Sequence, residues 1–194
     1  MTPSTSTPLD RRVRRTRLAL REALVLLVAE RGWDAVSVQD LCNRADVGRS
    51  TFYLHFQSKE DLLAEGLNEL RGALLEQGAT IRRTRGVIFP FVRGLFEHVH
   101  ERRALFRSLI GRGSGYLVQQ RFRKMVVQLV EAELSRQAAA GWRRDAAGHY
   151  VSGALVELMG WWVDATPRRS VEEVESLFHQ LTAPVMAQLE RAVR

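Results

Sequence analysis

The chain has 194 residues, 45% of them hydrophobic, which is enough to bury the core of one domain or two small ones and excludes disorder over most of the length. Its 29 Lys and Arg residues against 22 Asp and Glu residues give a net charge of +7 and a pI of about 10.6, which favours a polyanionic partner, either nucleic acid or an anionic membrane surface. We expect a cytoplasmic protein, because the chain has a single cysteine, Cys42, and shows no apolar stretch typical of a secretory signal. Its longest apolar run, Ala23–Ala29, is too short to span a bilayer.

The N-terminal segment predicts a polar arm followed by a helix. Residues 1–10 are mostly small and polar with two prolines, so we expect them to be disordered. Five arginines follow within residues 11–17, and they either contact DNA phosphates or the minor groove, or form a solvated tail. Arginine also outnumbers lysine in the chain as a whole, and the codons of a GC-rich genome would produce the same bias. From Leu20 apolar residues recur with helical spacing, and Gly32 is the expected C-cap.

The next segment predicts two short helices joined by a tight turn. Ser37 is a good N-cap for a helix over 38–45, and Asp40, three residues on, suggests an imperfect capping box. Residues 46–48 break this helix, and another is expected over about 49–55, before Ser58 caps a fourth. This spacing fits a helix-turn-helix, in which the second helix enters the DNA major groove.

The rest of the chain predicts further helices. They are expected at 87–100, 103–110, 116–139, 145–165 and 171–193, after a connection at 82–86, and Pro184 should kink or weaken the last one. Strand-like alternation never extends beyond a few residues. The predicted fold class is therefore all-α, with about nine helices.

Three stretches carry a resemblance to a known family. RRTRLALREALVLLVAERGWDAVSVQDLCNRADVGRSTFYLHFQSKEDLL, and within it the pattern T-F-Y-x-H-F-x-S-K-E-x-L at 51–62, resembles the N-terminal domain of TetR-family transcriptional regulators. FEHVHERRALFRSLIG and HYVSGALVELMGWWVDATPRRSVEEVESLF resemble a subgroup that includes regulators of dihydroxyacetone-kinase operons. The sequence departs from the family pattern at Asp46 in the turn, at Gly48 before the recognition helix, and at Leu54, where a polar residue is common.

The resemblance implies a domain plan and a function. Residues 11–57 would form the helix-turn-helix DNA-binding domain, and residues 58–194 a helical domain for ligand binding and dimerisation. The chain would be a homodimer joined through its last two helices, and would act as a repressor released from a palindromic operator by a small hydrophobic ligand. The alternative is a TetR-like regulator whose C-terminal domain binds a protein partner in place of a small molecule.

The expected DNA contacts lie on the second helix of the motif and at the ends of its neighbours. An arginine at position 49 can grip a guanine with two hydrogen bonds, and a tyrosine at 53 can reach a phosphate or a thymine methyl. Lys59 would clamp a phosphate at the start of the next helix. The full set of candidates is Ser37, Arg49, Ser50, Thr51, Tyr53, His55 and Lys59.

The C-terminal part offers many apolar side chains and no convincing catalytic set. They are either ordinary core or, collectively, the wall of the pocket that the resemblance implies. The candidate ligand-binding residues are Phe96, Phe106, Phe122, Met125, Leu155, Met159 and Trp162. We expect no cofactor and no metal site, since His55 has no second ligand at useful spacing, and an enzyme is disfavoured because no nucleophile or acid–base pair stands out.

Overall fold

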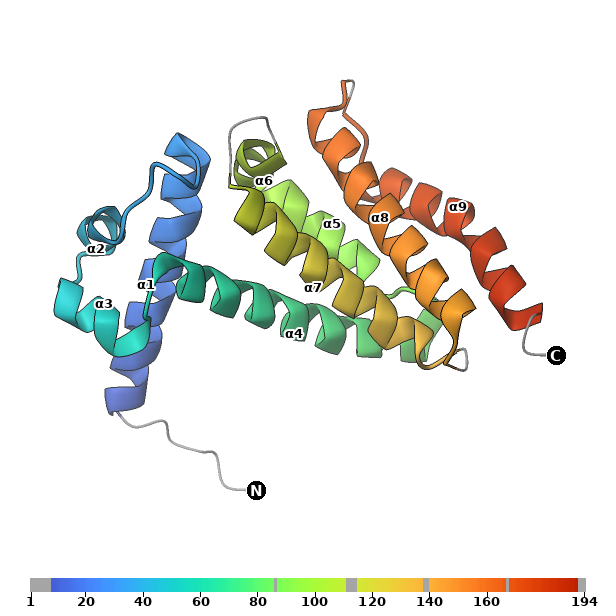
Figure 1. Cartoon of the computed structure of the whole chain (residues 1–194), viewed down its shortest axis with the longest axis horizontal. Helices are drawn as coiled ribbons and strands as arrows, with labels where there is room; N and C mark the ends of the chain where they lie inside the picture. Colours follow the sequence, from blue (N-terminus) through green and yellow to red (C-terminus); the bar gives the residue numbers. More distant parts are fainter. Residues whose placement is uncertain (1–7, 86, 111–114, 138–139, 167, 192–194) are drawn as a thin grey trace.

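A computed structural model describes residues 8–85, 87–110, 115–137, 140–166 and 168–191. Within these ranges the chain forms helices without any strand (Figure 1). No helix there is both long and apolar enough to span a membrane. The helices are α1 (Pro8–Arg31), α2 (Val38–Ala45), α3 (Arg49–His55), α4 (Lys59–Arg85), α5 (Val92–Glu101), α6 (Arg103–Ile110), α7 (Tyr116–Leu134), α8 (Trp142–Asp164) and α9 (Val171–Arg191).

Several helix ends differ from the prediction. The helix α1 begins at Pro8, so residues 8–10 are helical and do not belong to a disordered arm; proline suits the first turn, where its missing N–H is not needed. The rest of the predicted arm lies outside the described residues. The helix α5 begins only at Val92, because Pro90 disfavours helical angles at Phe89, while α9 runs through Pro184.

The described residues form two hydrophobic cores. The first joins α1, α2, α3 and the start of α4, and its largest side chains include Phe52, Phe56 and Trp33. The second joins α4, α5, α6, α7, α8 and α9 and contains Phe89, Phe96 and Trp162 among many aliphatic residues. In Figure 1 the long helix α4 runs from the first unit into the second, and α3 and α9 lie at opposite ends of the molecule.

Close contacts fasten the two units together. Val118 of α7 is buried in the first core, and the hydroxyl of Ser108 in α6 donates to the carbonyl of Val28 in α1 at 2.9 Å. Gly115 has a positive φ of 33°, and a Cβ there would meet the ring of Trp33 at 2.8 Å, so this position needs glycine. The start of α7 therefore lies directly against the first unit.

A half-buried histidine, His98, lies in the last turn of α5. The ring of His98 packs edge-on against Phe106 with centroids 6.2 Å apart, and Arg102 Nη1 lies 3.2 Å from its Nδ1. Burial, aided by the nearby charge of Arg102, lowers the pKa of His98 to about 4. A guanidinium can only donate, so this contact requires a neutral ring with an unprotonated Nδ1.

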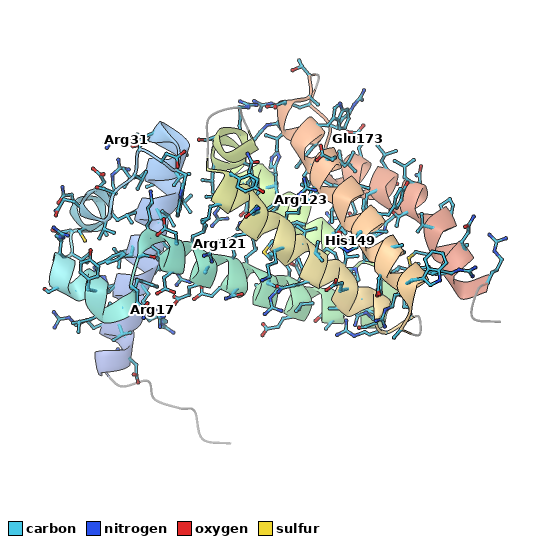
Figure 2. The ribbon with its side chains drawn as sticks, viewed as in Figure 1. Arg17, Arg31, Arg121, Arg123, His149 and Glu173 are labelled. Atoms are coloured by element: carbon cyan, nitrogen blue, oxygen red, sulfur yellow. The ribbon has the colours of Figure 1, made fainter. Side chains whose placement is uncertain are left out.

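The protein should lose stability between pH 6.5 and pH 4 through His98. The folded pKa lies below the ordinary value of about 6.5, so the unfolded chain binds the proton more readily and stability present above pH 6.5 falls as the pH drops. The contribution reaches at most about 3 kcal/mol at pH 4. Urea unfolding at pH 7 and pH 4.5 should show a smaller acid loss in His98→Leu than in wild type. The exposed His149 on α8 (Figure 2) supplies the control His149→Leu, which should behave like wild type. Equal acid losses in all three proteins would contradict the prediction.

Candidate nucleic-acid interface

The first helix of the motif is fixed by a complete capping box. The backbone N–H of Asp40 donates to Ser37 Oγ at 3.2 Å, and the backbone N–H of Ser37 donates to Asp40 Oδ2 at 2.9 Å. The hydrogen bond from the Ser37 side chain lowers the pKa of Asp40, so this carboxylate stays ionised at neutral pH. The predicted N-cap is confirmed, and the hydroxyl of Ser37 is engaged in it.

The turn between α2 and α3 tolerates both departures from the family pattern. Asp46 adopts a left-handed conformation with φ 53° and ψ 49°, and the N–H of Val47 donates to Cys42 O at 3.0 Å. Gly48 is the N-cap of α3 in an extended conformation open to any residue. A Cβ there would make only ordinary contacts with Ser50 and Thr51, so the fold does not require glycine at position 48. Gly48 places no side chain at the start of α3.

One side of the helix α3 is buried in the first core, and the opposite side is exposed to solvent. Phe52 is fully buried and packs against Phe56 with ring centroids 5.8 Å apart. The exposed residues of α3 are Arg49, Ser50, Tyr53 and Leu54. The guanidinium of Arg49 lies 6.0 Å from the ring of Tyr53, so these two candidate readers are neighbours.

Thr51 and His55 lie at the edge of this exposed face. Both are half-buried, and the ring of His55 is 6.4 Å from that of Phe56. Each of these two side chains is therefore partly packed against its neighbours and partly accessible. Neither a cluster around His55 nor any other group of His, Cys, Asp and Glu in the described ranges is arranged to hold a metal ion.

Lys59 has a structural role that the sequence did not reveal. Its ammonium donates to the carbonyls of Trp33 at 2.9 Å and Val36 at 2.7 Å, and it lies 4.6 Å from the centre of the Trp33 ring. The side chain thus joins the α1–α2 connection to the start of α4. The acceptors are backbone carbonyls 23 and 26 residues away, and no local pattern signals such partners.

Other basic side chains of this unit are also paired. Arg44 forms a two-hydrogen-bond pair with Glu30, at 3.0 and 2.7 Å, and this bonding lowers the pKa of Glu30. Arg31 lies 3.5 Å from Asp40. The arginines at 11, 12, 14 and 15 are exposed on the first turns of α1, within the same unit as α3. These four arginines add exposed positive charge to the unit that contains α3.

The predicted ligand-binding residues form packed core. Six of the seven are buried, and Phe122 is half-buried. The ring of Phe96 meets Trp162 edge-on at 5.3 Å, and Phe106 meets Phe122 at 5.2 Å. These side chains therefore pack against one another between α5, α6, α7 and α8.

Two cavities lie elsewhere in the part of the chain that the structure describes. One of about 470 Å³ is lined by Val87, Ile88, Phe89, Glu172, Glu175, Ser176, His179, Thr182, Ala183 and Met186. Another of about 520 Å³ is lined by Arg71, Gln128, Glu131, Ala132, Leu134, Ser135, Arg144 and Asp145. Burial lowers the pKa of His179 in the first cavity. Neither cavity includes a predicted ligand-binding residue.

Comparison with known proteins places the helix-turn-helix unit in a family. The sequence profile described as "Bacterial regulatory proteins, tetR family" matches residues 20–65. The uncharacterized HTH-type transcriptional regulator YxbF of Bacillus subtilis (strain 168) is 39% identical over 56 residues, which make up 28% of this chain and 15% of that protein. The matched segment is therefore well under half the length of that curated relative.

Solved structures share the fold along most of the chain. A TetR transcriptional regulator from Streptococcus agalactiae 2603V is 25% identical, with 90% of this chain and 97% of that chain covered and a TM-score of 0.65. The dihydroxyacetone kinase operon activator DhaS is 16% identical, with 90% and 96% covered and a TM-score of 0.61. The predicted all-α fold class is confirmed, and the relatives are transcriptional regulators, not enzymes.

Replacing Lys59 should destabilise the N-terminal unit. In Lys59→Ala two carbonyls lose a charged donor and Trp33 loses its cation contact, so the free energy of unfolding should fall by about 2 kcal/mol. Urea unfolding measures this change. The other lysine of the chain supplies the control, because Lys124 is exposed on α7 and Lys124→Ala should change stability by less than about 0.5 kcal/mol. An unchanged unfolding midpoint in Lys59→Ala would show that the side chain serves only as a phosphate contact.

Proposed function

Because this chain is a TetR-family transcriptional regulator with a DNA-binding helix-turn-helix domain, we propose that it is a homodimeric repressor released from a palindromic operator by a small hydrophobic ligand. The observation that carries the proposal is the division of α3 into two faces. Phe52 holds the helix in the first core, while Arg49 and Tyr53 stand exposed on it. Such a helix can enter the major groove without rearranging the domain.

Each exposed polar residue of α3 has a role in this proposal. Arg49, at the start of the helix, donates two hydrogen bonds to a guanine edge, and Tyr53 contacts a phosphate or a thymine methyl. Ser50 is small and lets the helix approach the bases. The exposed arginines of α1 add phosphate contacts that raise affinity without specificity, which makes binding strongly dependent on salt.

The outer faces of α8 and α9 support the homodimer. Exposed residues of α8 recur at Tyr150, Ala154, Glu157 and Trp161, the spacing of one helix face. On α9, Leu181 is 63% exposed and Leu177 is also exposed. Apolar side chains of this size on neighbouring helices are typical of a protein–protein interface. A second copy would cover them about a two-fold axis and set two α3 helices about 34–36 Å apart.

We propose repression on physical grounds. A dimer that occupies successive major grooves covers promoter DNA and blocks access by polymerase. The relative DhaS is an activator, so the shared fold does not fix the direction of the effect. The hydrophobic ligand would act by binding a conformation in which the α3 helices no longer match the grooves.

The filled C-terminal core gives weight to a second candidate. The rings of Phe106, Phe122, Phe96 and Trp162 fill the place where a pocket was expected, so a small ligand would have to displace them. A protein partner on the surface needs no such opening. Release of bound operator from purified protein by an apolar compound would support the first candidate. Release only by another protein would support the second.

Selection from a random DNA pool tests sequence reading. Wild type should enrich a palindrome, and Arg49→Ala should bind the selected duplex about 5- to 100-fold more weakly with relaxed preference at one symmetric base pair, because a bidentate guanine contact is lost. The control is Lys124→Ala, which alters an exposed cation of α7 outside the helix-turn-helix unit and should leave the consensus intact. If no duplex is enriched by wild type at low salt, the proposed function fails.

A charge placed on α9 tests the dimer. Leu181→Arg puts two cations into the proposed two-fold interface, so the protein should sediment as a monomer of about half the wild-type mass and bind the palindrome far more weakly. The matched control is Leu26→Arg, at a leucine of α1 that is 51% exposed and far from α9, which should leave the mass unchanged. A dimer that persists in Leu181→Arg would place the interface elsewhere.

A further inference from the structure

Leu54 is the most exposed large apolar side chain in the part of the chain that the structure describes. It is 81% exposed, whereas the other leucines with high exposure reach 63% at Leu181 and 51% at Leu26. A single exposed leucine on a surface is ordinary. The position of this one is what distinguishes it, because it lies on the second helix of the DNA-binding motif.

Leu54 lies at the centre of the free face of α3. At 100° per residue, both Ser50 and Leu54 point about 160° away from the buried Phe52 around the helix axis. They are four residues apart and therefore adjacent on that face. Because Ser50 and Gly48 are small, Leu54 is the largest side chain at the centre of this face and would be the first to contact a surface that α3 approaches.

The surroundings of Leu54 argue against a protein partner. Its neighbours on the same face are the polar Ser50 and Thr51, with Tyr53 and Arg49 to one side. A protein interface has an apolar centre of several side chains, and this face offers only one leucine and the ring of Tyr53. A mixed face of arginine, serine, tyrosine and one aliphatic group matches the mixed chemistry of base edges in the major groove.

We propose that Leu54 reads the 5-methyl group of a thymine in each operator half-site. The inference rests on the proposed DNA-binding function and adds a specificity-determining residue to it. Thymine is the base that presents a methyl group in the major groove, and an aliphatic side chain recognises it by excluding water from both apolar surfaces. Burying one methyl should raise affinity about 4-fold per half-site, and about 15-fold over a symmetric pair of half-sites.

Removing the methyl group alone tests the proposal. The duplex selected by wild type is resynthesised with deoxyuridine in place of thymine, one symmetric pair of positions at a time, so that the Watson–Crick and groove hydrogen-bonding groups stay the same. Wild type should lose about 15-fold at one pair of positions. Leu54→Ala should bind the thymine and deoxyuridine duplexes equally. The exposed site makes misfolding of this variant a minor concern, and Leu26→Ala, at an exposed leucine outside α3, should keep the full methyl preference.

The outcomes separate this inference from the proposed function. A palindrome that binds tightly with no sensitivity to deoxyuridine would overturn the role of Leu54 and leave the regulator intact. Methyl sensitivity that persists in Leu54→Ala would also overturn it and assign the methyl contact to Tyr53. Failure of wild type to bind any duplex at low salt would overturn both proposals.

Discussion

The burial of Phe52 and Phe56 is the constraint on which the candidate DNA-binding surface depends. The helix α3 has only seven residues and would not be stable alone, since short helices are marginal in water. Its two phenylalanines fix it against α1, α2 and the start of α4, and they use up the apolar side of the segment. The exposed side chains of α3 are therefore held in place without being part of the core. A rigid base under a polar face is what recognition of DNA requires, because the helix then enters the groove without an ordering cost.

The same first core is tied to the rest of the chain through α6 and α7. Ser108 holds the carbonyl of Val28, and Gly115 lets α7 begin against Trp33. At the other side of α6, Arg103 donates to the carbonyl of Trp162 at 3.0 Å and Arg107 to that of Val163 at 3.1 Å, near the C-terminal end of α8. The short helix α6 therefore contacts both the C-terminal end of α8 and the helix α1 of the first unit.

The sequence was most informative where structure is local. Ser37 and Asp40 cap their own helix, Asp46 supplies its own left-handed turn, and apolar spacing predicted α2 and α3 with the ends that the structure shows. It was least informative where partners are distant. The role of Lys59 depends on the carbonyls of Trp33 and Val36, and the packing of Phe106 against Phe122 depends on how α6 meets α7. Aromatic composition alone cannot separate a filled core from a pocket, because both use the same residues.

Among the exposed apolar groups of the described residues, those on α8 and α9 differ from Leu54 on α3 in their surroundings. On α8 and α9 they lie on neighbouring helices and include Trp161, 54% exposed, together with Leu177 and Leu181. In the proposed dimer these side chains would exclude water against the same residues of a second copy. Leu54 stands alone among polar side chains, so no broad apolar surface can form around it. A single methyl-sized contact is the largest apolar interaction it can make without desolvating its neighbours, and the major groove offers contacts of that size beside hydrogen-bonding groups.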